Sequence, residues 1–414
     1  MKKTLDINEQ ILGNGLKLIS VKRDTELFSL NLGIKVGALL EEKAEKGITH
    51  FIEHMLFKGT NKRNNEVLNR ELELIGGEYN AYTEYNSTVY TINALNTEIS
   101  KSIELLSDMV LNSVFDSKEI EKEKSVVISE IGSKKDDLEY LCIQKAIELA
   151  FEKSNLKYDT LGKKSDINKL TRSQIIEFYK KYYVPSNSVM IVISNFEHQY
   201  IKELVETHFL PWKDKKMLKE KILVEDNIPL IKKTYKRDCE HVNIAYLFTF
   251  HGLTYQEELA LRILCYKLGE SQNSILFRKL REDRGLVYDI YSDIDNSKNI
   301  KLIYFYTSVN EENMDEAMDI IEKSFEDIKN KKIKYTKDDI ELMKKIFKTS
   351  LTSTLEDTIE LGDYLLSLVL DERNVSEYEN YDKNLEEINV EDIQSIAAKV
   401  LCNPTLHIIS SKKE

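Results

Sequence analysis

The sequence predicts a mixed α/β protein made of two similar halves. Its 414 residues are enough for two domains, because one domain usually takes about 100 to 200 residues. Apolar alternation typical of strands is interleaved with helix-period stretches along the whole chain. A helix–turn–strand segment at residues 170–194 also has a counterpart at residues 388–410.

The predicted elements begin with a hairpin near the amino terminus. Residues 11–21 alternate in hydropathy around Gly13-Asn14-Gly15, which can supply the positive backbone angles of a tight turn. Further along the chain, alternation with a period of two predicts strands and a period of 3.6 predicts helices. The predicted strands are 30–36, 87–94 and 188–194, and the predicted helices are 65–74, 99–112 and 173–183.

The repeated segment divides the chain. Both copies read as an amphipathic helix, a turn with proline and a strand. Any two helix–turn–strand units look alike, but these two also end their respective halves, which favours duplication. Between them, residues 213–238 are lysine-rich at both ends and contain Pro229, as expected of an exposed crossing. We therefore expect a first domain at 1–215, a linker at 216–236 and a second domain at 237–414.

Composition excludes several classes of protein. With 42% hydrophobic residues, 14 Gly, 4 Pro and 4 Cys, the chain is neither disordered, collagen-like nor a disulfide scaffold. A net charge of -12 without Lys/Arg-rich blocks argues against a nucleic-acid partner. No apolar run predicts a secretory signal or a membrane span, so we expect a cytoplasmic protein with no membrane partner. The cysteines are too far apart to suggest a disulfide framework: Cys142, Cys239, Cys265 and Cys402.

A pattern of polar residues at 47–60 predicts a metal site. On a helix, His50, Glu53 and His54 share one arc of about 100°, opposite an apolar face. Two imidazoles one turn apart can reach a single ion, and a carboxylate between them can hold a water. With seven histidines in 414 residues, a chance H-x-x-E-H has odds on the order of one in a hundred. A zinc site is therefore favoured over coincidence.

A catalytic zinc ion usually has three protein ligands, so a third ligand must come from elsewhere. Residues 116–131 predict a helix that Asp116 caps. On it, Glu123 and Glu130 are seven residues apart and share a face. On the residues alone, this face is more typical of an ordinary solvated one.

His50-Phe51-Ile52-Glu53-His54 followed by Glu130 resembles the inverzincin signature of the pitrilysin/insulinase family of zinc metallopeptidases. The resemblance implies one Zn²⁺ per chain, with His50, His54 and Glu130 as ligands and Glu53 as the general base. It also implies that Glu123 supports the ligands from behind.

The flanking segments extend the resemblance. Residues 75–95 are similar to the family's edge strand, and there Asn80 and Ala81 would pair through their main chain with an extended substrate. An ordinary hairpin with a Gly-Gly turn is the alternative for this stretch.

The second half contains a segment at 276–292 that resembles the family's Arg/Tyr element. The resemblance assigns Arg281 and Tyr288 to substrate binding and oxyanion stabilisation. Arg284 and Tyr291 have the same spacing, and we prefer the first pair because its flanking residues fit the family pattern better. The second half has no H-x-x-E-H, so it resembles the duplicate without metal.

The family implies a fold and an activity. Each half would be a mostly antiparallel sheet packed with helices, and four halves would form a clamshell. A chain with two halves therefore predicts a homodimer, with a heterodimer of related chains as the alternative, in which Arg281 and Tyr288 of one subunit reach the zinc of the other. The expected activity is that of a processing-peptidase-like endopeptidase, in which Glu53 deprotonates the attacking water and passes the proton to the leaving amine.

The family's chamber admits unfolded peptides, and the acidic surplus of this chain would favour basic ones if it lined that chamber. Peptide turnover, precursor trimming and leader removal are all compatible with the motifs. A non-catalytic partner subunit is the main rival function, but such relatives have typically lost part of the zinc motif, whereas this chain keeps all of it. The composition, rich in Lys, Ile and Asn, hints at an AT-rich bacterial source.

Overall fold

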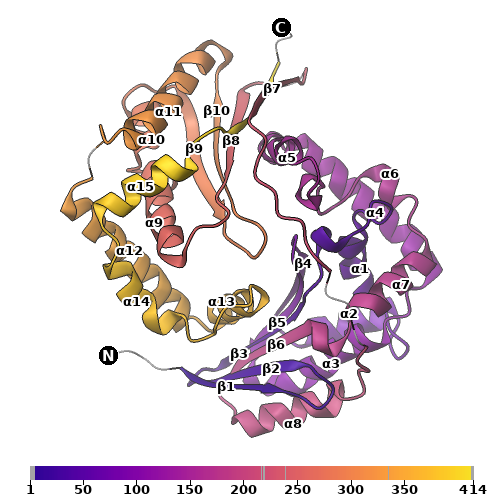
Figure 1. Ribbon diagram of the computed structural model, residues 1–414. Helices are drawn as coiled ribbons and strands as arrows, with labels where there is room; N and C mark the ends of the chain where they lie inside the picture. Colours follow the sequence, from indigo (N-terminus) through magenta and orange to yellow (C-terminus); the bar gives the residue numbers. More distant parts are fainter. Residues whose placement is uncertain (1–4, 216, 218–219, 238, 334, 412–414) are drawn as a thin grey trace. The chain divides into compact units, whose positions relative to one another are not determined.

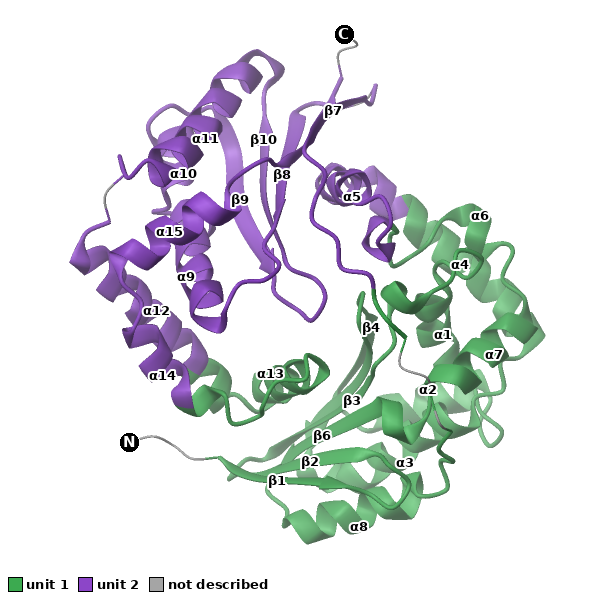
Figure 2. Cartoon of the chain, in the orientation of Figure 1, with its two compact units in different colours: residues 1–132, 158–222, 352–379 green, residues 133–157, 223–351, 380–414 purple. Residues whose placement is uncertain are grey.

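The computed structural model divides the chain into two compact units (Figure 2). It describes residues 5–215, 217, 220–237, 239–333 and 335–411. Unit 1 comprises residues 1–132, 158–222 and 352–379, and unit 2 comprises residues 133–157, 223–351 and 380–414. No helix in the described part of the chain is long and apolar enough to cross a membrane.

Unit 1 is built on a six-stranded, mostly antiparallel sheet (Figure 1). The exception is the β2–β6 pair, which is parallel. The hairpin predicted at the amino terminus is the β1–β2 pair. Strand β4 forms one edge of the sheet. The strand order is β1 (Asp6–Ile11), β2 (Lys17–Lys22), β6 (Ser188–Ser194), β3 (Leu27–Ile34), β5 (Thr88–Leu95) and β4 (Glu78–Thr83).

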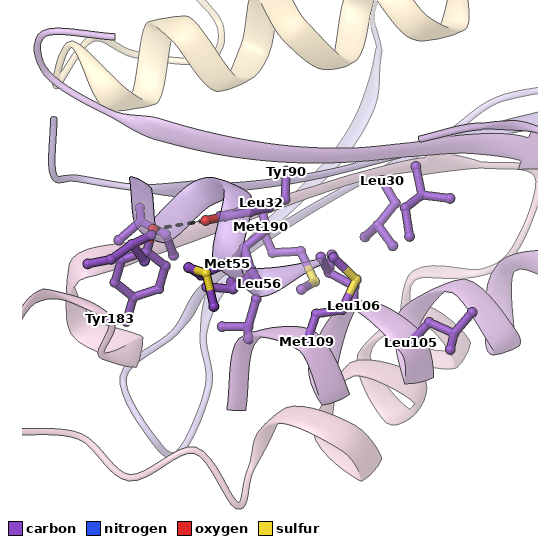
Figure 3. Packing of buried hydrophobic residues seen from close by; sticks show 14 of the residues in the cluster. Leu30, Leu32, Met55, Leu56, Tyr90, Leu105, Leu106, Met109, Tyr183 and Met190 are labelled. Atoms are coloured by element: carbon purple, nitrogen blue, oxygen red, sulfur yellow. Dashed lines mark hydrogen bonds between the residues drawn. The ribbon is translucent and has the colours of Figure 1, made fainter. Parts of the chain in front are cut away.

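Helices that bury their apolar faces cover one side of this sheet. Met55 and Leu56, on the helix with the predicted metal motif, pack with Leu106 and Met109 of α3 in this core (Figure 3). The first half of the sequence contributes these helices to unit 1: α1 (Ile48–Leu56), α2 (Asn65–Leu74), α3 (Ile99–Asn112), α4 (Ser117–Asp136), α6 (Lys164–Ile167), α7 (Arg172–Tyr182) and α8 (His198–Phe209).

The other side of the sheet is covered by α13 (Thr358–Leu370), which comes from the second half of the sequence. Its leucines pack on the strand residues Ile19, Ile191 and Ile193. The helix lies so close that a Cβ on Gly362 would stand 2.6 Å from the Ser29 hydroxyl. Both sides of the sheet are therefore buried, which explains why β6 is apolar without alternation.

Unit 2 repeats this plan with five strands. As α13 does in unit 1, a helix from the other half of the sequence packs on this sheet: α5 (Leu138–Ala150) contacts β8 and β11. Strand β9 forms an edge of the sheet, and the β7–β11 pair is parallel. The strand order is β7 (Leu230–Tyr235), β11 (Thr405–Ser410), β8 (Val242–Thr249), β10 (Leu302–Val309) and β9 (Val287–Asp295). The remaining helices are α9 (Tyr255–Cys265), α10 (Ile275–Phe277), α11 (Met314–Lys329), α12 (Lys337–Glu356), α14 (Tyr378–Glu386) and α15 (Val390–Val400).

The repeated segments occupy matching places in the two units. Helix α7 leads into β6, and α15 leads into β11. Each helix begins with a capping box, made by Thr171 with Gln174 and by Asn389 with Asp392. Each strand then lies between one parallel and one antiparallel neighbour. The predicted fold of two homologous halves, each a mostly antiparallel sheet packed with helices, is confirmed.

The compact units do not follow one boundary along the chain. The chain passes from unit 1 to unit 2 after residue 222, within the predicted linker, but residues 133–157 and 352–379 each lie in the other half's unit. Residues 230–235 of the predicted linker form β7. Residues 216, 218 and 219 of that linker lie outside the described residues. Each exchanged segment contains the helix, α5 or α13, that packs on the sheet of its unit.

Candidate metal centre

Helix α1 presents three polar side chains from an otherwise buried element. Its apolar residues, among them Phe51 and Ile52, are fully buried in the core of unit 1. His50 and Glu53 are buried, with only 7% and 8% of their surface exposed. His54 is half-buried. The core contacts hold the helix so that these polar groups face away from the core, as the sequence pattern predicts.

Helix α4 supplies the carboxylates. Asp116 caps it by accepting the backbone N–H of Lys118 at 2.8 Å. Glu123 is buried, whereas Glu130, two turns further along, is half-buried. The core residue Val127 lies between them and anchors this face of α4.

Three of these side chains converge on one point. Nε2 of His50 lies 3.2 Å from Nε2 of His54, and the Oε2 atom of Glu130 lies 3.7 Å and 3.6 Å from these two nitrogens. Neighbouring donors around a tetrahedral zinc ion stand about 3.3 Å apart, given zinc–nitrogen bonds of about 2.0 to 2.1 Å. The spacing and the donor set of two imidazoles and one carboxylate therefore fit zinc.

His54 is oriented from behind. Its Nδ1 lies 2.8 Å from the Oε1 atom of Glu123, whose other oxygen accepts the Lys58 ammonium at 2.8 Å. When Nδ1–H donates to Glu123, Nε2 keeps its lone pair for a metal. Burial alone would raise the pKa of Glu123, but the hydrogen bonds from His54 and Lys58 outweigh it and lower the pKa. Glu123 is thus a charged acceptor.

The two histidines have opposite pKa shifts. Burial, together with the positive charge of its neighbour His54, lowers the pKa of His50 to about 3. Burial would also lower the pKa of His54, but the hydrogen bond to Glu123 and the surrounding carboxylates outweigh burial and raise it. His50 is therefore neutral at physiological pH, as a metal ligand must be.

Glu53 has an environment suited to proton transfer. The Thr83 hydroxyl, on β4, donates to its Oε2 atom at 2.6 Å. Burial raises the pKa of Glu53, and the hydrogen bond from Thr83 opposes that shift. A carboxylate whose pKa is moved towards neutrality is a more effective general base.

Strand β4 lies beside this helix, because Thr83 on β4 contacts Glu53 on α1. Asn80 and Ala81 are in the middle of β4 and pair with Thr91 and Tyr90 of β5. Among the strands that the structure describes in unit 1, β4 pairs with β5 alone, so its second edge is open. The segment is therefore an edge strand that forms a hairpin with β5, but the turn of that hairpin lies at residues 84–87 and not at Gly76-Gly77.

The Arg/Tyr segment lies in unit 2, so it belongs to a different compact unit from His50, His54 and Glu130. The Arg281 guanidinium stands 4.9 Å from the ring centroid of Phe277 and 5.4 Å from that of Tyr288. Tyr288 is 81% exposed at the start of β9. Arg281 and Tyr288 are therefore both exposed on unit 2, with their side chains in contact with each other.

The alternative pair has internal partners in unit 2. Arg284 donates to the Lys279 carbonyl at 2.9 Å and lies 3.7 Å from the carboxylate of Glu316. The Tyr291 hydroxyl donates to Glu139 at 2.6 Å. These bonds hold both side chains in the structure of unit 2.

Three supporting residues escaped the sequence reasoning: Lys58, Thr83 and Glu41. Lys58 follows His54 by four residues, which is a weak signal that both side chains contact the same partner, Glu123 of α4. Thr83 and Glu41 reach α1 from other elements, and only the fold brings them there.

Comparisons with known proteins identify relatives along most of the chain. The family model described as Insulinase (Peptidase family M16) matches residues 18–164, and the one described as Peptidase M16 inactive domain matches residues 169–347. A protein of Rickettsia felis named uncharacterized zinc protease is 28% identical over 317 residues, 74% of each chain. A Bacillus subtilis protein with the same description is 27% identical over 346 residues, 83% of each chain.

The fold also has solved counterparts. The structure of a protease from Helicobacter pylori matches with a TM-score of 0.89, covering 98% of this chain and 99% of that one, at 20% identity. The residues 18–164 that match the first family model include the H-x-x-E-H motif, and the residues 169–347 that match the model described as inactive contain no such motif. The chain therefore belongs to peptidase family M16, the insulinase family, and its relatives from Rickettsia felis and Bacillus subtilis are named as zinc proteases.

Proposed function

We propose that this protein is a zinc-dependent endopeptidase that cleaves unfolded peptides or precursor and leader segments. The observation that supports this best is the convergence of His50, His54 and Glu130 on one point, with Glu53 on the same helix. The family membership supports a peptidase, and the names of the relatives support zinc as the metal.

His50, His54 and Glu130 would hold the ion. Zinc bound by two neutral imidazoles and one carboxylate supplies a Lewis acid that acidifies water and polarises a peptide carbonyl. Glu53 takes a proton from the attacking water and then passes it to the leaving amine. The Thr83 hydroxyl holds the Glu53 carboxylate in place, and burial keeps the pKa of Glu53 raised, so that it can both accept and release the proton.

The substrate would bind as an added strand on β4. Asn80 and Ala81 would offer backbone groups to an extended peptide, a mode that reads main chain rather than side chains and so requires an unfolded segment. The contact between Thr83 and Glu53 supports this assignment, because a peptide on β4 would lie next to the general base.

Arg281 and Tyr288 would complete the site by binding substrate and stabilising the oxyanion, with the pair supplied by the second subunit of a homodimer. The exposure of Tyr288 supports this pair over Arg284 and Tyr291, which are held by internal partners. An acidic chamber would favour basic peptides.

The test is metal analysis combined with peptide cleavage. The purified chain should contain about one zinc per chain, cleave unstructured peptides, lose cleavage with a chelator and regain it with zinc. Light scattering on the same sample should give the mass of two chains. A matched set of acidic and basic peptides, assayed at low and high salt, tests the preference for basic substrates. Cleavage that persists at the full rate in the metal-free protein would contradict the proposal.

A further inference from the structure

Helix α1 begins without a capping side chain of its own. Gly47 stands at the N-cap position with φ 84°, and no side chain at that position accepts a hydrogen bond. The first N–H groups of a helix lack partners within the helix and must be satisfied in another way. In α1 this matters for function, because His50 is the third residue of the helix and lies in its first turn.

The missing cap is supplied by Glu41, from the segment that joins β3 to α1. Its Oε2 atom accepts the backbone N–H of Gly47 at 2.9 Å, and its Oε1 atom accepts that of Thr49 at 3.0 Å. Ile48, between them, donates to the Glu45 carbonyl at 2.9 Å. One carboxylate therefore holds the backbone on both sides of the first helical residue, and its negative charge stands at the positive end of the helix dipole.

Glu41 is an unusual group for this task because only 1% of it is exposed. Burial raises the pKa of Glu41 to about 7, against the opposing effects of the bonds from Thr49 and Gly47 and the charge of Lys46. Lys46 is also buried, and its ammonium donates to the Glu41 carbonyl at 2.7 Å. A buried carboxylate is costly to fold, so an ordinary exposed cap would serve stability better.

The matching helix of unit 2 has such an ordinary cap. Helix α9 follows β8 as α1 follows β3, and it begins with a capping box in which Thr254 and Glu257 satisfy each other's backbone N–H groups. In α9, which is described in full and lacks the H-x-x-E-H motif, the capping side chains come from the start of the helix itself. The buried cap from a preceding segment, Glu41, is found instead on α1, the helix that carries the metal motif.

The two histidines also differ in how they are held. Glu123 fixes the ring of His54 through its Nδ1 atom. Within the part of the chain that the structure describes, the buried Nδ1 atom of His50 has no hydrogen-bond partner. The His50 ring thus lacks the hydrogen-bonded support that Glu123 gives to His54, whereas Glu41 holds the backbone at the residue next to His50, Thr49.

We propose that Glu41 is a positioning residue for the metal centre, whose buried carboxylate fixes the first turn of α1 and thereby places His50. This inference rests on the proposed zinc site. Partners that orient ligands without touching the metal typically change metal affinity about 10- to 100-fold when they are replaced, and Glu41 should act in that range.

The test compares zinc affinity in wild type, Glu41→Gln and Thr254→Ala, using the full chain and a competing chromophoric chelator. Gln keeps the shape and one acceptor oxygen of Glu41, and Thr254→Ala removes the cap of the matching helix without metal. We expect Glu41→Gln to bind Zn²⁺ at least about tenfold more weakly and to change the visible spectrum of the Co²⁺ form. Thr254→Ala should match wild type in zinc affinity and in the visible spectrum of the Co²⁺ form.

Equal zinc affinity of Glu41→Gln and wild type would overturn this inference and leave the proposed function intact. A wild-type chain that binds no zinc would instead overturn the proposed function, and this inference with it. If Glu41→Gln does not fold, Glu41→Asp takes its place, since it keeps the charge but shortens the reach to Gly47 and Thr49. Unchanged affinity in Glu41→Asp would overturn the inference in the same way.

Discussion

At the scale of single residues, the candidate metal centre contains identical side chains whose pKa values differ because of their surroundings. Glu53 and Glu123 are both buried, yet the pKa of Glu53 is raised and that of Glu123 is lowered. The difference arises because Glu123 accepts hydrogen bonds from two basic groups, whereas Glu53 accepts one from a neutral hydroxyl. Glu123 is thus suited to hold a ligand in place, and Glu53 is suited to exchange a proton.

Replacing Glu123 tests its supporting role. Glu123→Gln should weaken zinc binding about 10- to 100-fold, because the neutral amide no longer polarises the Nδ1–H of His54. Competition with a chromophoric chelator measures the affinity. Glu121→Gln, an exposed change on the same helix, is the matched control and should bind like wild type. Equal affinity in the two variants would contradict the role of Glu123.

Glu41 gives the apoprotein a specific pH dependence. Its pKa is about 7 in the folded chain and 4.5 ordinarily, so the folded state binds this proton more tightly than the unfolded state. The resulting stabilisation is complete below about pH 4.5 and is lost as the pH rises to about 7 and beyond.

The free energy of unfolding of wild type, relative to Glu41→Gln, should therefore fall by up to about 3 kcal/mol between about pH 4 and pH 8. Urea unfolding of both proteins with a chelator present measures this difference, in which the other titrating groups cancel. A difference that rises with pH over the same window would show that the pKa of Glu41 is lowered instead.

At the scale of elements, the sequence predicts what local chemistry determines. The polar arc and apolar face of α1 and the Asp116 cap of α4 follow from residue spacing alone. The assignment of Glu130 as the third ligand needed the family resemblance, because spacing could not distinguish it from a solvated residue. The Glu41 cap could not be predicted, since it spans a loop whose path only the folded chain defines.

The start of α1 also depends on glycine, which gives a paired prediction. A Cβ on Gly47 would lie 2.6 Å from the Leu161 carbonyl oxygen, and its φ of 84° disfavours any other residue. Gly47→Ala should lower the free energy of unfolding by about 1 to 3 kcal/mol or more. Gly132→Ala, inside α4, meets nothing within 4 Å and should raise it by about 0.5 to 1 kcal/mol. Urea unfolding tests the pair, and equal effects would contradict the role of Gly47.

At the scale of the whole molecule, the duplication could be predicted from the sequence but the exchange of helices could not. The repeat is a local pattern, and it gave the correct order of helix and strand in both halves. The exchange depends on which helix covers the second face of each sheet, a long-range choice. One signal was present: α13 is largely apolar, with Leu361, Leu365 and Leu366 buried, as expected of a helix packed on a sheet.

The proposed role of Glu53 is proton transfer beside a zinc ion held by His50, His54 and Glu130. The most direct measurement is zinc content together with peptide cleavage for wild type and Glu53→Gln. The variant should keep about one zinc per chain and its fold, and its rate should fall at least about 100-fold, because Gln cannot accept the proton. A Glu53→Gln protein that binds zinc and cleaves at the wild-type rate would contradict the account.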